Sequence, residues 1–196
     1  MGKIIYLMGK SSSGKDTIFR ELLKRNQTEF NTIVPYTTRP IRAGETDGQA
    51  YNFTDEEGFQ NQKAGGRVIE HRAYHTYHGL WRYFTVDDGQ IDLENKNYIM
   101  IGTLESYLSV GKYFGQEHMI PVLIELDDGI RLQRALDRER QQEHPKYEEM
   151  CRRYLADSED FAEVKIKDAG IGKRFYNDNL EKVLEQIEAY ITEELS

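Results

Sequence analysis

The feature that most constrains this chain is a glycine-rich loop between a short apolar run and a helical pattern. Residues 4–8 are apolar on both faces of a strand, which is typical of a central parallel strand, and residues 9–15 read G-x-x-x-x-G-K. Apolar residues then recur at helical spacing. We therefore predict an anion site in which backbone amides and the helix dipole hold phosphates and Lys15 adds a compact cation.

The residue that follows this lysine departs from the usual pattern. Asp16 occupies the position where Ser or Thr normally offers a hydroxyl to magnesium, and Thr17 comes next. A carboxylate is a hard oxygen ligand that Mg²⁺ accepts readily, although its charge also comes close to the phosphates. We expect a magnesium site at Asp16, at Thr17 or at both, and the residues themselves leave that choice open.

The rest of the chain alternates strands with helices and carries one β-rich insertion. Apolar runs at 97–101 and 120–126 predict strands, and each leads into a helical pattern, at 104–114 and 130–142. This alternation predicts an α/β protein. Residues 36–87 break the rhythm with aromatic, Thr and Gly residues in short alternating runs, so we predict an inserted β-rich lobe there.

The last fifty residues predict two further helices around a short strand. Residues 146–163 scatter a few apolar side chains among many charges, which predicts a helix that is solvated on most of its surface. Residues 174–176 predict a strand. An apolar stripe from Leu180 to Ile191 then predicts an amphipathic helix that packs on the sheet.

Charge and cysteine content narrow the compartment and the partners. The 26 basic and 34 acidic residues leave a net charge of -8, which disfavours the nucleic-acid backbone as a partner. Cys151 is the only cysteine, so no internal disulfide can form, and this is consistent with a reducing compartment. No apolar run approaches the length of a spanning helix. We expect a cytoplasmic monomer or homodimer that binds small molecules, with neither nucleic acid nor membrane as a partner.

A second group of residues, in the predicted lobe, is suited to a phosphorylated acceptor. Arg39 and Arg42 lie three apart on a loop bounded by glycine and proline, and Tyr51 follows. Each guanidinium offers a planar fork of donors and the tyrosine adds a neutral donor, so the three can converge on one phosphate.

At this point the sequence resembles the guanylate kinase family, and the resemblance extends over nearly the whole chain. It is carried by motifs in the family's order: the phosphate loop, T-T-R-x-x-R-x-G-E from Thr37 with its trailing Y-x-F, E-x(7)-H-G from Glu70, the pair Arg134 and Arg138, Arg-Tyr-Leu at 153–155, and Asn177-Asp178-Asn179-Leu180. The resemblance implies ATP as co-substrate, Mg²⁺, and transfer of the γ-phosphoryl group to a nucleoside monophosphate, with GMP first.

The resemblance also implies roles for individual residues. ATP would be held by the phosphate loop and its neighbours: Gly9, Lys10, Ser11, Ser12, Ser13, Gly14, Lys15, Asp16, Thr17 and Asn177. The acceptor would be held by Arg39, Arg42, Tyr51, Glu70, His78 and Thr103, with Glu70 accepting hydrogen bonds from the guanine edge. The groups closest to the transfer itself would be Lys15, Arg39 and the lid arginines Arg134, Arg138 and Arg153.

The chain departs from the family pattern at two further places. Pro35 replaces a serine that usually contacts guanine, and Ile101-Gly102-Thr103 replaces a D-x-D run, so both acids are missing. We hypothesise that Asp16 partly restores the carboxylate lost at Ile101. A related family, the ribose bisphosphate phosphokinases, often carries G-K-D in the loop and also lacks these acids, so it stays an alternative. A non-catalytic guanylate kinase-like binding module is an alternative of another class, which the intact Lys15 disfavours.

The resemblance also implies the fold, a P-loop three-layer α/β/α domain with a parallel central sheet. We expect a core of residues 1–34, 91–130 and 165–196, an acceptor-binding lobe at 35–90 and a helical lid at about 131–164.

Overall fold

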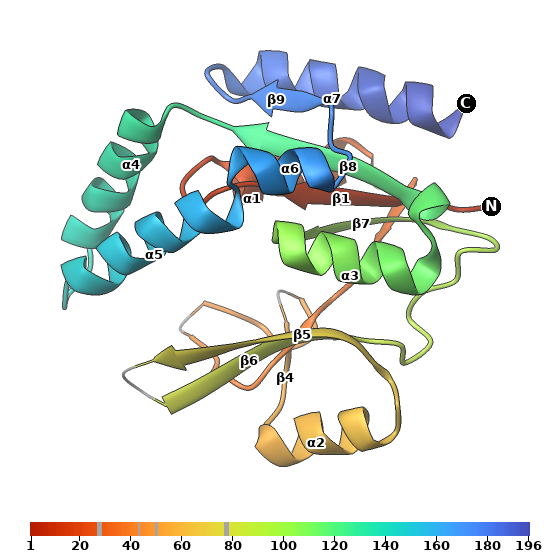
Figure 1. The fold of residues 1–196 in the computed structure, drawn as a ribbon, viewed down its shortest axis with the longest axis horizontal. Coiled ribbons are helices and arrows are strands. Elements are labelled where there is room, and N and C mark those ends of the chain that lie inside the picture. Colours follow the sequence, from red (N-terminus) through yellow and green to blue (C-terminus); the bar gives the residue numbers. More distant parts are fainter. Residues whose placement is uncertain (27–28, 43, 50, 77–78) are drawn as a thin grey trace.

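The computed structural model describes residues 1–26, 29–42, 44–49, 51–76 and 79–196 of the chain (Figure 1). Within this part of the chain the strands form two sheets, a five-stranded one and a four-stranded one. None of the helices described is both long enough and apolar enough to span a bilayer.

The five-stranded sheet forms the centre of the core and all of its pairings are parallel. In spatial order its strands are β2 (Phe30–Thr32), β7 (Asn97–Gly102), β1 (Ile4–Met8), β8 (Met119–Glu125) and β9 (Arg174–Tyr176). Every residue of β1 is buried, as its two-sided apolar run predicts. The carboxyl end of β1 therefore opens directly into the phosphate loop.

Helices cover both faces of this sheet and make the three-layer arrangement (Figure 1). Alternate residues of β1 enter different cores, as the period of a strand requires. Ile5 and Leu7 pack with α1 (Lys15–Arg25) and α7 (Leu180–Leu195). Tyr6 and Met8 pack on the other face with α3 (Leu104–Phe114) and the short α6 (Glu163–Asp168). The predicted α/β/α fold is confirmed.

The inserted lobe has its own sheet and a small core. Its strand order is β4 (Asn52–Phe53), β3 (Tyr36–Thr37), β6 (Gly79–Val86) and β5 (Val68–Thr76), and it carries the helix α2 (Glu56–Ala64). Phe59 of α2 is fully buried against Phe84 and Val86. The sheet lies below the core in Figure 1, and β5 packs against α3.

The apolar pattern does not predict helix α2 because Phe59 is its only buried side chain. A helix with one buried residue shows no apolar stripe. The sequence carries one signal for the start of this helix, the capping residue Asp55. In the structure the Asp55 side chain accepts a hydrogen bond from the Gly58 amide. The strand β2 is not predicted either, because Phe30 is the one apolar residue among its three.

The region expected to form a lid contains α4 (Asp128–Arg140) and α5 (Tyr147–Asp160), which pack on each other beyond the end of β8, and we refer to these two helices as the lid. The helix expected at 130–142 begins two residues earlier, because the Asp127 side chain caps it by accepting from the Ile130 amide. Helix α5 has no buried residue, which agrees with the predicted solvated helix. A short 3-10 helix, η1 (Gln116–His118), precedes β8.

Candidate active site

The phosphate loop has the backbone conformation that its glycines permit. Gly14 has φ +90°, and a Cβ atom built there would lie 2.3 Å from Nδ2 of Asn177. Only glycine fits both constraints. Ser12 is the single non-glycine residue with positive φ among those described, at +63°, a conformation that costs free energy unless its surroundings hold it. The contacts that hold this loop come from the lid and from Asn177, which directly follows β9.

Two lid helices bind the backbone of Ser11 from both sides. The Ser11 amide donates to Oδ2 of Asp157 at 2.7 Å, and the Ser11 carbonyl accepts from Nη1 of Arg131 at 3.0 Å. Arg131 and Asp157 also form an ion pair of 3.5 Å with each other. Nη2 of Arg153 lies 3.4 Å from the Ser11 hydroxyl. We refer to Arg131 and Asp157, with the Ser11 backbone between them, as the lid clamp.

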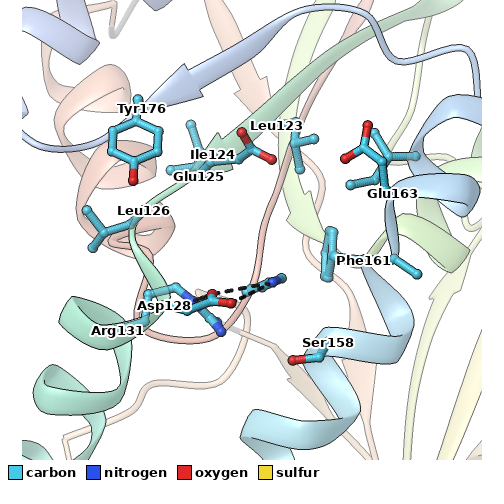
Figure 2. Close-up of a pocket in the computed structure, with 13 residues that line it drawn as sticks. Leu123, Ile124, Glu125, Leu126, Asp128, Arg131, Ser158, Phe161, Glu163 and Tyr176 are labelled. Atoms are coloured by element: carbon cyan, nitrogen blue, oxygen red, sulfur yellow. Dashed lines mark hydrogen bonds and ion pairs between the residues drawn. The ribbon is translucent and has the colours of Figure 1, made fainter.

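Asp128 links the lid clamp to the second residue of the loop. Its carboxylate accepts from Nε of Arg131 at 3.0 Å (Figure 2) and forms a 3.3 Å ion pair with Nζ of Lys10. Burial opposes ionisation of Asp128, but the Arg131 hydrogen bond and the Lys10 charge outweigh it and lower the pKa of the carboxyl below its ordinary value. Arg131 is only 1% exposed and also lies 5.0 Å from the Tyr154 ring centroid.

This charged chain forms one end of a cavity of about 400 Å³ (Figure 2). The other end of the cavity is mostly apolar, with Leu123, Phe161 and Ile166 among its lining residues. The two cations that line this cavity, Lys10 and Arg131, both pair with the Asp128 carboxylate. The carboxylates of Glu125 and Glu163 also line it. The cavity therefore carries no excess positive charge that would select a phosphate. We place the ATP phosphates elsewhere.

Asn177 holds the loop from the opposite side. Its side chain is buried, and its Nδ2 donates to the Ser13 carbonyl at 2.8 Å. Its backbone amide donates to the Glu125 carbonyl. The hydroxyls of Ser12 and Ser13 are buried and have no hydrogen-bond partner among the residues described. Asn177 is therefore a support of the loop, and the two serine hydroxyls remain available to phosphate oxygens.

A second cavity, of about 280 Å³, lies on the other side of the loop and brings predicted residues of two elements together. It is lined by Ser12, Gly14, Asp16, Thr17, Arg134 and Arg138. It shares no lining residue with the larger cavity. The two lid arginines of helix α4 thus face the part of the loop whose amides begin helix α1, which is where the helix dipole favours anions.

Lys15 and Asp16 lie at the start of helix α1. Nζ of Lys15 is 3.8 Å from Oδ2 of Asp16, and the Asp16 side chain is 79% exposed. No cluster of three or more His, Cys, Asp or Glu residues able to hold a metal exists in the described chain. An exposed carboxylate beside a hydroxyl nevertheless suits Mg²⁺, which usually binds one or two protein oxygens and takes the rest from phosphates and water.

In the inserted lobe, Arg39 is a buried and fully engaged arginine. Its side chain is 3% exposed and forms two parallel hydrogen bonds with Glu45, at 2.6 and 2.7 Å. Its guanidinium also lies 5.1 Å from the ring centroids of Tyr51 and Phe53. The hydrogen bonds from Arg39 lower the pKa of Glu45 to about 2. Burial raises the pKa of Tyr51, so its hydroxyl stays a donor.

Arg42 differs from Arg39 because its side chain is exposed. Its backbone amide donates to Oε2 of Glu45 at 2.8 Å, so Glu45 holds both arginines of the motif on one short loop. The Arg42 guanidinium can therefore bind a ligand without breaking an ion pair such as the one between Arg39 and Glu45. The predicted phosphate ligand His78 lies outside the described residues.

Glu70 lies in β5 with both carboxylate oxygens already in contact with neighbours. Oε1 accepts from the Thr85 hydroxyl at 2.9 Å, and Oε2 accepts from Nε of Arg72 at 3.2 Å. Nη1 of Arg72 in turn lies 3.5 Å from Oγ1 of Thr103, at the start of helix α3. Arg72 thus connects the residue predicted to read the base with the predicted acceptor residue of the core.

Thr103 itself caps helix α3. Its side chain accepts from the Ser106 amide at 3.3 Å, and the Ser106 hydroxyl accepts from the Thr103 amide at 3.1 Å, which completes a capping box. A Cβ atom on Gly102 would lie 2.1 Å from the Tyr6 hydroxyl. Ile101 is partly buried against the core that includes Leu7. In the segment that lacks the two family acids, Thr103 therefore caps a helix and Ile101 packs in the core.

Sequence reasoning missed three residues of this site: Arg72, Arg131 and Asp157. Arg72 had a usable signal, because a residue two positions after Glu70 in a strand lies on the same face of the sheet. Arg131 and Asp157 had none, since each is one charged residue among many on its helix. Their roles depend on contacts between segments that are far apart in the chain.

A family model and several curated relatives match part of the chain. Residues 1–82 match the family model described as guanylate kinase. A guanylate kinase of Lactiplantibacillus plantarum is 36% identical over 73 residues, which are 37% of this chain and 35% of that protein. A guanylate kinase of Chlorobium luteolum is 36% identical over 78 residues, which are 40% of this chain and 39% of that protein. The aligned segments thus span about two fifths or less of these relatives.

The likeness in three dimensions extends further than the likeness in sequence. The crystal structure of guanylate kinase from Anaplasma phagocytophilum matches 98% of this chain and 86% of its own, with a TM-score of 0.66 and 19% sequence identity. The resemblance to the guanylate kinase family is confirmed in sequence for residues 1–82, which carry the phosphate loop and most of the inserted lobe. The fold is confirmed for nearly the whole chain.

Proposed function

We propose that this protein transfers the γ-phosphoryl group of ATP to a nucleoside monophosphate, with GMP as the first candidate. One observation carries the proposal: Arg134 and Arg138 of the lid line the same cavity as Ser12, Gly14 and Thr17 of the phosphate-loop region. A loop that binds phosphates, faced by two arginines on a separate element, is the arrangement that phosphoryl transfer requires. The guanylate kinase match over residues 1–82 supports GMP as the acceptor.

The residues of this site act by positioning groups and by compensating charge. Loop amides, the Lys15 ammonium and the serine hydroxyls hold the β- and γ-phosphates, while Arg134, Arg138 and Arg153 face the charge that develops on the transferred group. Arg42 and Tyr51 hold the acceptor phosphate, with Arg39 and Glu45 supporting them. No general base is needed, because the attacking atom is already an anionic phosphate oxygen.

Asp16 and Thr17 are the residues that would hold Mg²⁺. When bound, the ion neutralises charge on the β- and γ-phosphate oxygens. We propose that Asp16 supplies the carboxylate absent at Ile101. Asp16→Ala should therefore raise the magnesium concentration needed for half-maximal turnover. Unchanged magnesium dependence would show that Thr17 or water takes this place.

The decisive experiment is ATP consumption measured with GMP, dGMP, AMP, UMP and ribose 1,5-bisphosphate as separate acceptors. We expect strict dependence on an acceptor and the highest kcat/KM with GMP. ATP consumption without any acceptor would contradict a kinase. Magnesium-dependent ATP binding without turnover on any acceptor would instead support a binding module.

The strongest rival acceptor is ribose 1,5-bisphosphate. Asp16 in the loop and the missing acids at Ile101 and Thr103 favour it. Glu70 favours GMP, because a buried carboxylate suits a base that presents donors.

Several broader features are part of the same proposal. The chain divides into a core, an acceptor-binding lobe at 35–90 and a lid at about 131–164 that closes over the phosphates and excludes water. The protein acts in the cytoplasm as a monomer or homodimer, and nucleotides are its partners.

A further inference from the structure

Arg72 is a partly buried cation in the acceptor lobe that the proposed function does not use. Its side chain is 15% exposed and its Nε donates to Oε2 of Glu70 at 3.2 Å. Glu70 and Arg72 are two residues apart on β5, so both side chains lie on one face of the lobe's sheet. The same face reaches the start of helix α3, where Thr103 lies 3.5 Å from Nη1 of Arg72.

Arg72 stays charged in this position. Burial opposes the charge, but the neighbouring Glu70 carboxylate outweighs it and raises the pKa of Arg72 above its ordinary value. A guanidinium has five N–H donors, and the contacts to Glu70, Thr103 and the Tyr74 side chain leave the remaining donors for a ligand. A carboxylate offers about four acceptor positions, and Thr85 and Arg72 each take one from Glu70. The pair therefore presents acceptors and donors side by side.

This pattern is complementary to guanine and opposite to adenine. Guanine carries the acceptors O6 and N7 next to the N1–H and N2 amino donors, whereas adenine carries an amino donor where guanine has O6. Glu70 can accept from the guanine donors while Arg72 donates to O6 and N7, the pairing that arginine makes with guanine elsewhere. An adenine in the same place would set its amino group against the guanidinium and leave both without partners.

Pro35 makes this role necessary. The proline has no side-chain donor, and its carbonyl accepts from the Asn52 amide at 2.9 Å. Thr103, the predicted contact on the other side, already caps helix α3. A guanine bound here would otherwise bury O6 without a strong donor. We infer that Arg72 is a specificity-determining residue that reads the O6 and N7 edge of the acceptor guanine. This inference rests on the proposed nucleoside monophosphate kinase activity.

The test uses base analogues that each remove one contact. 6-Thio-GMP replaces O6 with a weak acceptor, 7-deaza-GMP lacks N7, and IMP lacks the N2 amino group that faces Glu70. We expect the unmodified protein to use each analogue about 10-fold or more less efficiently than GMP, measured as kcat/KM. We expect Arg72→Met to lower kcat/KM for GMP by about 10- to 100-fold. This variant should lose the penalties for 6-thio-GMP and 7-deaza-GMP and keep the penalty for IMP.

Arg82→Met is the matched control. Arg82 lies on the neighbouring strand β6, is 16% exposed and pairs with Glu56 at 2.8 Å, so it is also a semi-buried arginine bound to a glutamate. It should keep the full analogue profile. Arg72→Lys is a second variant to use if Arg72→Met does not fold. Lysine keeps the positive charge but lacks the two-pronged donor group of arginine. The loss of kcat/KM with 6-thio-GMP and with 7-deaza-GMP, relative to GMP, should therefore become smaller for both analogues.

Three outcomes would overturn the inference. One is an unmodified protein that uses 6-thio-GMP and 7-deaza-GMP as well as GMP. Another is a folded Arg72→Met or Arg72→Lys protein that still penalises both analogues in full. The third is turnover with ribose 1,5-bisphosphate and with no nucleoside monophosphate, which would reject the GMP acceptor itself. Turnover of GMP with unaltered analogue preferences rejects only the role of Arg72, so the two failures are distinguishable.

Discussion

The two ends of the candidate site are held in place by different kinds of contact. Ser11 of the phosphate loop is bound by Asp157 and Arg131, which lie 146 and 120 residues away in the chain. The acceptor loop is held by Arg39 and Glu45, only six residues apart. Long-range contacts set the proposed ATP end when the whole domain folds, whereas the proposed acceptor end is organised by its own short segment.

This difference indicates which of the two loops can move independently of the core. A loop organised by a local ion pair can keep its internal geometry while the lobe that carries it changes position relative to the core. A loop clamped by lid helices depends on where those helices lie. We therefore expect changes in the lid clamp to alter the handling of ATP, and changes around Glu45 to alter the handling of the acceptor.

The largest effect is expected from Lys15→Met. Removing a cation aimed at the transferred group should lower kcat by roughly 10²- to 10³-fold with little change in thermal stability. ATP consumption with GMP and a thermal melt measure the two quantities. Lys24→Met is the control, since Lys24 lies on the same helix, is 66% exposed and forms an ion pair with Glu21. Full turnover by the Lys15 variant would contradict the phosphate loop as the ATP site.

The next largest effect is expected from Asp157→Ala, which removes the acceptor for the Ser11 amide. We expect the KM for ATP to rise by roughly 10- to 100-fold, because a hydrogen bond to a charged group is lost, and the KM for the acceptor to change little. Glu159→Ala, at an exposed position of the same helix, should behave like the unmodified protein. Equal increases in both KM values would remove the distinction between the two ends.

Arg42→Ala should produce the reverse pattern. Loss of its exposed fork should raise the KM for the acceptor about 10-fold and leave the KM for ATP unchanged. Steady-state kinetics with each substrate varied in turn would measure this. Arg20→Ala, which removes an exposed arginine of helix α1 outside the acceptor loop, is the control. If the Arg42 variant changed the KM for ATP instead, the assignment of the acceptor end would be wrong.

The smallest effect concerns the stability of the acceptor loop at acid pH. The pKa of Glu45 is about 2 in the folded protein, below its ordinary value of 4.5, because Arg39 stabilises the carboxylate. Its stabilising contribution is complete above pH 4.5 and is lost as the pH falls towards 2. Glu45→Gln should therefore lower the free energy of unfolding by about 1–2 kcal/mol at pH 6 and by less at pH 3.

Urea unfolding at both pH values measures this difference. Glu57→Gln removes an exposed carboxylate of the same lobe and should leave the free energy of unfolding close to that of the unmodified protein at each pH. A Glu45 variant whose destabilisation is equal at the two pH values would show that the pair contributes packing and not charge.

Much of the architecture could be predicted from the sequence because its signals are local. The strand Ile4–Met8 and the helix Leu104–Phe114 were predicted with the bounds that the structure has. The spacing of apolar residues indicates which faces of an element are buried, and this signal is clearest for a fully buried strand or a strongly amphipathic helix. Helix α2 was missed because one buried residue, Phe59, leaves no period to read.

The sequence by itself determined the phosphate loop, the acceptor-loop motif and the α/β alternation, because each depends on residues close together in the chain. Only the tertiary structure decided that Arg39 is engaged by Glu45 while Arg42 is exposed, that Arg72 reaches Thr103 of the core, and that Asp157 binds the Ser11 amide. A charged side chain in a sequence carries no record of its partner. Its partner is determined by which segments the folded core brings within hydrogen-bonding distance, and that depends on the packing of the whole chain.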